Sequence, residues 1–358
     1  MKKICTIAFL ISCFLIAQQG YALPRFTSSA FLKCQNCHID PNGGGMRNYY
    51  GVMMYGRQTL PVHSWTDDST MLNFTPRLND FISIGMDMRT LFMYQQQRDY
   101  TSMYQMQGDI YLNARISNKI LLSVTKSIFH DFEIFGIAQI LPLNGYVKVG
   151  RFTPAYGTRI DDHTAFIRSK TVFPLYRRPD TGFEVGISPT SLTWNAGVYN
   201  GEDGSDPSNG RIRLVTTRGE ALFRIENINI SLGGSVWHNR GLTGTLIMYG
   251  GFAGLYYKDV AINAEIDMKK DKAGPGTQEL ITYLEINCLL LNGFYLKFMY
   301  DFYDPDIDYK TGSESRYSLG IEFFPLPGVE MRPVFRILKN TPGDAHDKEF
   351  DFLVHLFL

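Results

Sequence analysis

The chain has 358 residues, with 35 Lys and Arg against 35 Asp and Glu, so its formal charge at pH 7 is zero. A chain without excess positive charge lacks the electrostatic footprint of nucleic-acid binding, and we expect no nucleic-acid partner. Beyond residue 22 no run of about 18 apolar residues occurs, which excludes membrane-spanning helices, although 25 Phe, 21 Tyr and 3 Trp make the chain rich in aromatic residues.

Residues 1–22 have the pattern of a secretory signal peptide. Two lysines precede an apolar run from Ile4 to Ala17, and Gly20-Tyr21-Ala22 supplies the small residues of a cleavage site. A lipoprotein box ending at Cys13 would interrupt the apolar run, so a lipid anchor is less favoured. We therefore expect an exported protein whose mature chain begins near Leu23.

The segment Cys34-Gln35-Asn36-Cys37-His38 carries the clearest chemical signal. Cys-x-x-Cys-His supplies two thiols, Cys34 and Cys37, for covalent attachment of haem, and an imidazole, His38, as the proximal ligand of the iron. A disulfide and a zinc site are the alternatives. Zinc would need two more ligands, and the other cysteine after the signal peptide, Cys288, lies far along the chain. The motif therefore favours one covalently bound haem c.

The distal position on the iron has several candidate ligands. Histidine and methionine are common axial ligands in electron-transfer haem proteins, and methionine raises the reduction potential. Each candidate also has a simpler interpretation, as a packing residue or a surface residue. The candidates are Met46, Met53, Met54 and His63.

From residue 80 to residue 358 the sequence alternates between apolar and polar residues. In residues 260–269 the even-numbered positions are apolar, and the odd-numbered ones are Ala, Asn, Glu, Asp and Lys. This period of two is that of a β-strand with one apolar and one polar face. We predict sixteen strands, at residues 80–94, 103–117, 119–128, 131–141, 144–152, 181–188, 190–199, 211–224, 227–238, 244–257, 259–269, 277–290, 292–303, 313–324, 328–338 and 347–358.

The connections between these strands differ in length. Those after even-numbered strands are short, whereas several after odd-numbered strands are long and polar, such as residues 201–210 and 304–312. Short periplasmic turns and longer external loops are typical of outer-membrane barrels. We therefore predict an all-β fold, an antiparallel, porin-like outer-membrane β-barrel of about 16 strands. A soluble all-β protein is the alternative, but it would expose many aromatic residues to water.

Residues 150–163 resemble the segment that enters the third external loop of bacterial porins. The loop from Thr153 to Thr181 is the longest in the predicted barrel. In porins this loop commonly folds inward, whereas an ordinary solvated loop is the alternative here. An inward loop would bring a set of charged residues toward the channel, namely Arg159, Asp161, Asp162, His163, Arg168, Lys170, Arg177 and Arg178.

A signal peptide, one Cys-x-x-Cys-His motif and a sixteen-strand barrel together resemble the fused cytochrome-porins of the outer membrane, known from iron-oxidising bacteria. Tyr55-Gly56-Arg57 adds a weaker likeness, and Gly43-Gly44-Gly45 departs from the family's pattern. The resemblance implies a signal peptide at residues 1–22, a monohaem c-type cytochrome segment at residues 23–79 and a transmembrane barrel at residues 80–358. The cytochrome segment is short, and we expect it to plug the lumen.

The resemblance implies electron transfer across the outer membrane through the single haem. The partners would be outer-membrane lipid, a periplasmic c-type cytochrome or similar carrier, and an extracellular metal, such as Fe(II), or another redox substrate. The alternative is a passive porin for small charged solutes with a structural or redox-sensing haem plug. An electron-transfer protein is favoured over a conventional enzyme, because no Gly-x-Ser-x-Gly elbow is present.

Overall fold

The computed structural model describes residues 26–27, 29, 31–62, 75–128, 132–171, 179–201, 213–241, 244–271, 276–309, 311–340 and 346–358. The predicted signal peptide, residues 1–22, lies outside these ranges. The candidate residues His63, Arg177 and Arg178 also lie outside them.

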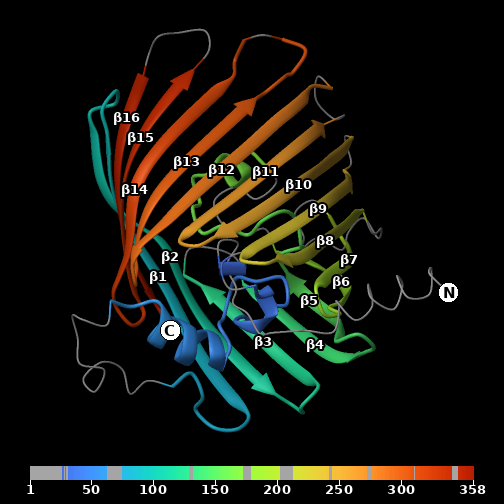
Figure 1. The fold of residues 1–358 in the computed structure, drawn as a ribbon. Coiled ribbons are helices and arrows are strands. Elements are labelled where there is room, and N and C mark those ends of the chain that lie inside the picture. The colour runs from blue at the N-terminus through green and yellow to red at the C-terminus, as the bar shows by residue number, and fades with distance from the viewer. Residues whose placement is uncertain are drawn as a thin grey trace, which may run out of the picture.

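In the described part of the chain, sixteen antiparallel strands form one closed barrel (Figure 1). Each strand pairs with the next along the chain, and β1 pairs with β16, so the sheet has no free edge. The strands are β1 (Ile82–Gln95), β2 (Tyr100–Arg115), β3 (Ile120–Ser127), β4 (Glu133–Leu141), β5 (Gly145–Phe152), β6 (Asp180–Ile187), β7 (Leu192–Tyr199), β8 (Leu214–Ile225), β9 (Ile228–Arg240), β10 (Thr245–Tyr257), β11 (Val260–Asp271), β12 (Gln278–Leu291), β13 (Phe294–Asp304), β14 (Glu314–Leu326), β15 (Val329–Asn340) and β16 (His346–Phe357).

The predicted barrel of sixteen antiparallel strands is therefore confirmed, and the strand boundaries differ from the predicted ones by only a few residues. Connections after even-numbered strands, such as residues 258–259 and 292–293, are short, whereas residues 153–179 separate β5 from β6. Because neighbouring strands run in opposite directions, the short turns share one end of the barrel. The C-terminal end of β16 lies at this same end.

The wall of the barrel has a polar inner face and an apolar outer face. In β14, Arg316 and Ser318 are buried inside, whereas Leu319 is 55% exposed on the outside. In β11, Glu265 is buried and its neighbour Ile266 is exposed. This arrangement reverses the usual distribution of a water-soluble domain and is the pattern of a barrel surrounded by hydrocarbon.

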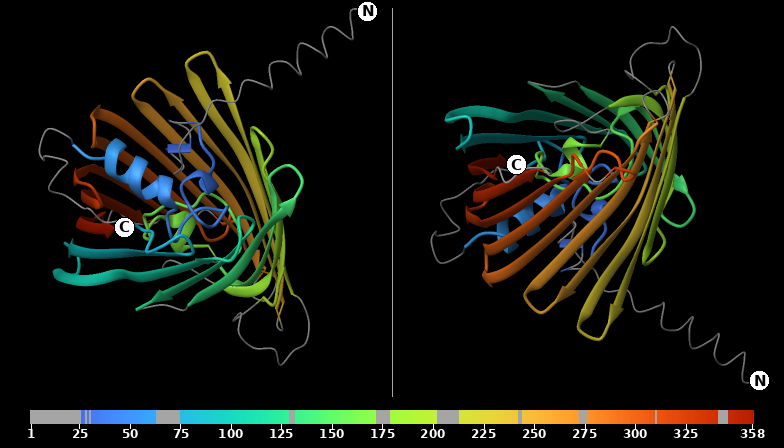
Figure 2. Two further views of the ribbon diagram at one scale, coloured as in Figure 1. Left: turned by 90° about the horizontal axis from the view of Figure 1, so that it is seen from below. Right: turned by 90° about the horizontal axis from the view of Figure 1, so that it is seen from above.

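Two segments lie inside the ring of strands, as both views in Figure 2 show. One, residues 31–62, is called the N-terminal segment below and contains the 3₁₀ turn η1 (Cys34–Asn36) and the π-helix η2 (Tyr50–Thr59). The other, residues 153–171, is called the inner loop and contains the short helix α3 (Phe166–Ser169). Among the described helices, none has the length and apolar character needed to span a membrane.

Apolar clusters fix both internal segments to the wall. The inner loop contributes Ile160, Ala165, Phe166 and Ile167 to a cluster with wall residues Ile281, Tyr283, Met299 and Val334. At the end with the short turns, the N-terminal segment packs against β14 and β16 in a cluster of Phe26, Tyr55, Leu60, Phe324 and Phe357. The lumen therefore contains packed protein rather than an open channel of uniform width.

Replacing Leu319 by Arg tests the orientation of the wall. An arginine on the hydrocarbon-facing surface should lower the free energy of unfolding in phospholipid vesicles by about 2–4 kcal/mol, as measured by urea titration. Leu319→Phe is the matched control and should change that free energy little. A loss below about 0.5 kcal/mol for Leu319→Arg, as on a water-exposed surface, would contradict the orientation.

Candidate functional site

The turn η1 folds the Cys-x-x-Cys-His motif back on itself. The carbonyl oxygen of Cys34 accepts hydrogen bonds from the backbone N–H groups of Cys37 (3.2 Å) and His38 (3.0 Å). Neither cysteine is in a disulfide in this structure, and Cys37 is buried whereas Cys34 is partly buried. The turn thus holds two thiols and an imidazole within five consecutive residues inside the barrel.

His38 is buried, with 9% of its surface exposed, and its Nδ1 has no hydrogen-bond partner among the described residues. Burial, with the charge of Arg47 adding to it, lowers the pKa of His38 to about 4. The imidazole is therefore neutral near pH 7, which is the form that binds a metal. A buried nitrogen without a partner carries a desolvation cost that a bound group could offset.

Three cavities meet at His38. Cavity A lies between the N-terminal segment and the inner loop and has an empty volume of about 1130 Å³, with His38, Met46, Arg89, Tyr156, Arg159 and Arg168 among its lining residues. Cavity B, about 520 Å³, is lined by Cys34 and His38. Cavity C, about 540 Å³, is lined by Cys37 and His38. The three cavities thus share His38, and each of the two cysteines lines one of them.

Glycines allow the rest of the N-terminal segment to pack against the motif. Gly43, Gly44 and Gly45 all have positive φ angles, a backbone conformation that residues with a side chain rarely adopt. A Cβ atom added to Gly43 would lie 3.1 Å from the Cβ of Cys34. In η2, a Cβ on Gly51 would collide with the carbonyl oxygen of Cys37. Within this glycine run, Gly43 therefore allows the close approach to Cys34.

A buried ion pair anchors the N-terminal segment to the wall. Asp40 Oδ2 lies 2.9 Å from Nζ of Lys148 on β5, and both side chains are buried. Burial raises the pKa of Asp40, but the charges of Lys148 and Arg159 outweigh it and lower the pKa below 3.8. Two residues further on, the Asn42 amide donates to Glu184 on β6 at 2.7 Å. These contacts place the chain after His38 against β5 and β6.

Further contacts place the segment at the end with the short turns. Lys33 Nζ donates to the carbonyl oxygen of Pro189, between β6 and β7, at 2.6 Å. Asn292, between β12 and β13, donates from its amide to the carbonyl oxygen of Pro61 at 2.9 Å. On the opposite wall, Arg47 pairs with Asp87 of β1 at 3.0 Å. The segment therefore contacts the wall in several directions.

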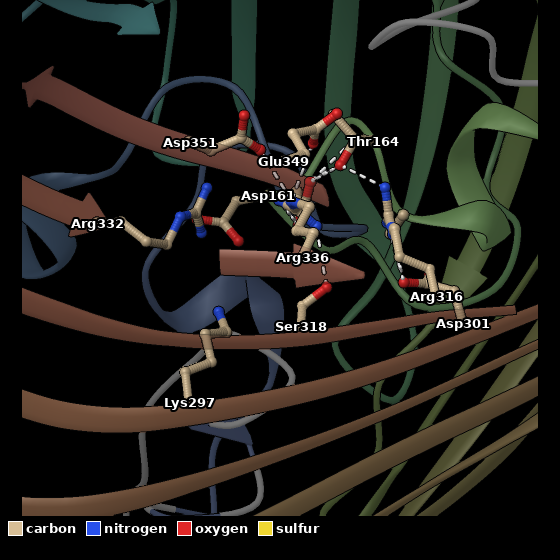
Figure 3. A network of polar contacts seen from close by, with 12 residues as sticks. Asp161, Thr164, Lys297, Asp301, Arg316, Ser318, Arg332, Arg336, Glu349 and Asp351 are labelled. Atoms are coloured by element: carbon tan, nitrogen blue, oxygen red, sulfur yellow. Dashed lines mark hydrogen bonds and ion pairs between the residues drawn. The ribbon is translucent and has the colours of Figure 1, made fainter. Parts of the chain in front are cut away.

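A row of arginines on β14 and β15 holds the inner loop (Figure 3). Asp161 pairs with Arg332 at 2.8 Å, and Asp162 pairs with Arg336 at 2.9 Å. Burial raises the pKa of Asp162, but Arg336 and the neighbouring arginines overcome this and hold the pKa well below its usual range. Arg316 Nη1 also donates to Thr164 Oγ1 at 3.0 Å. These contacts fix the loop inside the barrel, against the wall.

The described distal-ligand candidates lie in different places. Met46 is buried beside His38 in cavity A, and its sulfur accepts a hydrogen bond from the Asn113 amide. Met53 lines a separate cavity with Pro327, near the end with the short turns, and does not share a cavity with His38. Met54 is 42% exposed. Of the described candidates, Met46 is the one that lines one of the three cavities around His38.

The loop candidates also divide into groups. Arg159, Asp161 and Arg168 line cavity A, and Arg159 reaches the N-terminal segment by donating to the carbonyl oxygen of Gly43. Asp162, His163 and Lys170 contact the wall instead: His163 lies 3.1 Å from Arg89, and Lys170 pairs with Glu314 at 2.7 Å.

Several polar residues around His38 were missed by the sequence analysis. Asp40 lies in the N-terminal segment, and Arg89, Lys148 and His355 lie on wall strands. The alternating pattern indicates that such wall residues face inward. It does not indicate which of them surround the same cavity.

Comparison with solved structures finds proteins with the same fold. The in-vitro folded OmpT of Vibrio cholerae in its trimer form has a TM-score of 0.57 and 10% identity, covering 77% of this chain and 99% of its own. The anion-selective porin from Comamonas acidovorans has a TM-score of 0.56 and 9% identity, covering 77% of this chain and 99% of its own. No protein-family model matches the chain, and a search of curated proteins gave no match. The fold is therefore that of outer-membrane porins.

Replacing Asp40 by Asn should release the N-terminal segment. The change leaves Lys148 buried without its anion, which costs about 3–5 kcal/mol, so trypsin cleavage at Arg47 should be faster by about 100-fold or more. Since the pKa of Asp40 in the folded state lies below 3.8, its contribution is complete above that pH and is lost as the pH falls further.

The matched control combines Asp40→Asn with Lys148→Met, which removes both charges and should restore most of the protection from trypsin. Equal cleavage rates in the wild type and in both variants would show that the ion pair does not hold the segment.

Proposed function

We propose that this protein is an exported outer-membrane electron-transfer protein that carries one haem c inside a porin-like barrel. Cys34 and Cys37 would attach the haem, and His38 would be its proximal ligand. The observation that carries the proposal is the buried, neutral His38, whose Nδ1 lacks a partner where the cavities lined by the two thiols meet.

The residues around the motif fit such a group. Cys34 and Cys37 are not in a disulfide, and they line different cavities that share His38. A covalently bound haem supplies reversible one-electron chemistry at its iron. Tyr55 and Leu60 pack with Phe357 in an apolar cluster at the end with the short turns. The N-terminal segment, residues 31–62, thus acts as the plug of the barrel.

The two ends of the barrel suggest two partners. The short turns would face the periplasm, as in outer-membrane barrels, and the N-terminal segment lies at that end. A periplasmic c-type cytochrome or similar carrier would therefore reach the N-terminal segment from the end with the short turns. An extracellular metal such as Fe(II), or another redox substrate, would approach from the side of the inner loop. The apolar outer face would contact outer-membrane lipid.

For the distal position, the structure favours Met46 over Met53 and Met54, since it shares cavity A with His38. His38 and Arg47 face each other in an antiparallel β-bridge, and the next residue, Ile39, donates its backbone N–H to the carbonyl oxygen of Met46. Neighbouring residues of an extended strand point to opposite sides, so Met46 must turn from its contact with Asn113 to reach a group bound at His38. Ligation by Met46 would therefore require rearrangement of this contact.

A passive porin for small charged solutes, with a structural or redox-sensing haem plug, is the second candidate function. Cavity A favours it, because charged residues of the inner loop, including Arg159 and Arg168, line the open space. The N-terminal segment counts against it, since its buried contacts with β5, β6 and β1 obstruct the lumen.

Expression with a cytochrome maturation system tests the haem. The wild type should retain haem through a denaturing gel and give a reduced-minus-oxidised spectrum of a c-type cytochrome. Replacing both Cys34 and Cys37 by Ala should abolish covalent retention because no thioether bond can form. Cys288→Ala is the matched control and should keep the full signal. A matured wild type with no haem absorption would refute the proposed electron transfer.

Planar-bilayer recording separates the two functions. If the N-terminal segment plugs the barrel, the wild type should conduct far less current than an open sixteen-strand porin. Asp40→Asn should increase the conductance, because it removes the anion that pairs with buried Lys148. A wild-type conductance equal to that of an open porin would instead support solute passage.

A further inference from the structure

Arg89 of β1 is a buried cation without an ion pair to a carboxylate in the described part of the chain. Its residue surface is 7% exposed, and its Nη1 donates to the backbone carbonyl of Asp161 at 2.9 Å. Its Nη1 also lies 3.1 Å from Nε2 of His163, and its Nε has no hydrogen-bond partner. Burying a charge without a counter-charge is costly, so the surroundings of Arg89 suit an anion.

The titratable groups around Arg89 already have other partners. Asp87 accepts hydrogen bonds from Arg47 at 3.0 Å and from His355 at 2.9 Å, and the carboxylate of Asp161 pairs with Arg332. Burial, together with the charge of Arg89, holds the pKa of His163 well below its usual range. His163 is therefore a neutral acceptor near pH 7 and supplies no counter-charge to Arg89.

A β-bulge lies beside Arg89. Between β1 and β2, Arg89 pairs with Gln107 but the next residue, Thr90, pairs with Gln105, so β2 contains one extra residue. The Gln105 amide donates to the carbonyl oxygens of Arg89 at 2.9 Å and of Gln107 at 2.7 Å. Bulges commonly redirect a side chain near a functional site. The hydrogen bonds of Gln105 stabilise this irregular stretch around Arg89.

Arg89 lines both cavity A and cavity C, and His38 lines both as well. Two other arginines of cavity A have carboxylate partners, because Arg47 pairs with Asp87 at 3.0 Å and Arg159 lies 3.6 Å from Asp40. Of the arginines that line both cavities with His38, Arg47 has Asp87 as its partner, so Arg89 is the one whose guanidinium is placed to bind an anion.

We propose that Arg89 binds a carboxylate group in the space it shares with His38, and that in the haem-carrying protein this carboxylate is a haem propionate. The identification with a propionate rests on the proposed function. In a chain without haem, the same guanidinium would bind the carboxylate of a small solute. The planar guanidinium is suited to either, since it can donate two parallel hydrogen bonds to one carboxylate.

A redox titration of the matured protein between pH 5 and pH 8 tests the propionate. In the wild type, Arg89 should keep the propionate ionised in both oxidation states, so the midpoint potential should change little with pH. In Arg89→Gln the propionate pKa should rise into this range, and the midpoint potential should fall as the pH increases. Arg89→Lys keeps the charge and should resemble the wild type.

Two controls assign the effect to Arg89 and the propionate. Arg224→Gln removes an arginine of β8 that does not line the three cavities, and it should keep the wild-type profile. The pH dependence of Arg89→Gln should persist when His163 is also replaced by Gln. An unchanged profile in Arg89→Gln, or a dependence that disappears with His163, would overturn the proposal while leaving covalent haem attachment intact.

If the wild type carries no haem after maturation, the proposed function is refuted. The carboxylate site at Arg89 is then tested with succinate as the probe. Calorimetry should then show succinate binding to the wild type and at least tenfold weaker binding to Arg89→Gln, since one charge-assisted hydrogen-bonding partner is lost. Absent or equal succinate binding in the two proteins would overturn the carboxylate site itself.

Discussion

The polar inner face of the barrel is the constraint on which the other features depend. Alternation along each strand places apolar residues outside, so charged side chains point into the lumen, where burial requires partners. The N-terminal segment meets this wall through Asp40 and Lys148, and the inner loop meets it through Asp162 and Arg336. Complementary charges, rather than apolar packing alone, therefore fix where the Cys-x-x-Cys-His motif lies.

The barrel could be predicted from the sequence because its signal is local. Each strand is recognisable by a period of two residues between apolar positions, as in β11. A closed up-and-down barrel then requires only that strands next to each other in the sequence pair. The Cys-x-x-Cys-His motif could be recognised for the same reason, since its residues are consecutive in the sequence. Haem binding at the motif stays a prediction, because the fold establishes only the barrel around it.

The surroundings of His38 could not be predicted, because they depend on residues far apart in the sequence. Asp40 and Lys148 are 108 positions apart, and nothing in either neighbourhood indicates the other. Arg89 lies beside an extra residue in β2, which the alternation of β1 does not reveal. The helix η2 forms over Gly51 and Gly56, which are poor helix formers, because both glycines allow close packing on their neighbours.

The N-terminal segment rests on the seam between the first and last strands. Arg47 pairs with Asp87 of β1, and its guanidinium lies 4.4 Å from the ring of Phe357 on β16. This docking surface exists only after β1 and β16 have paired. Docking of the N-terminal segment at this seam therefore requires that β1 and β16 have paired, so the segment reaches its final position only in a closed barrel.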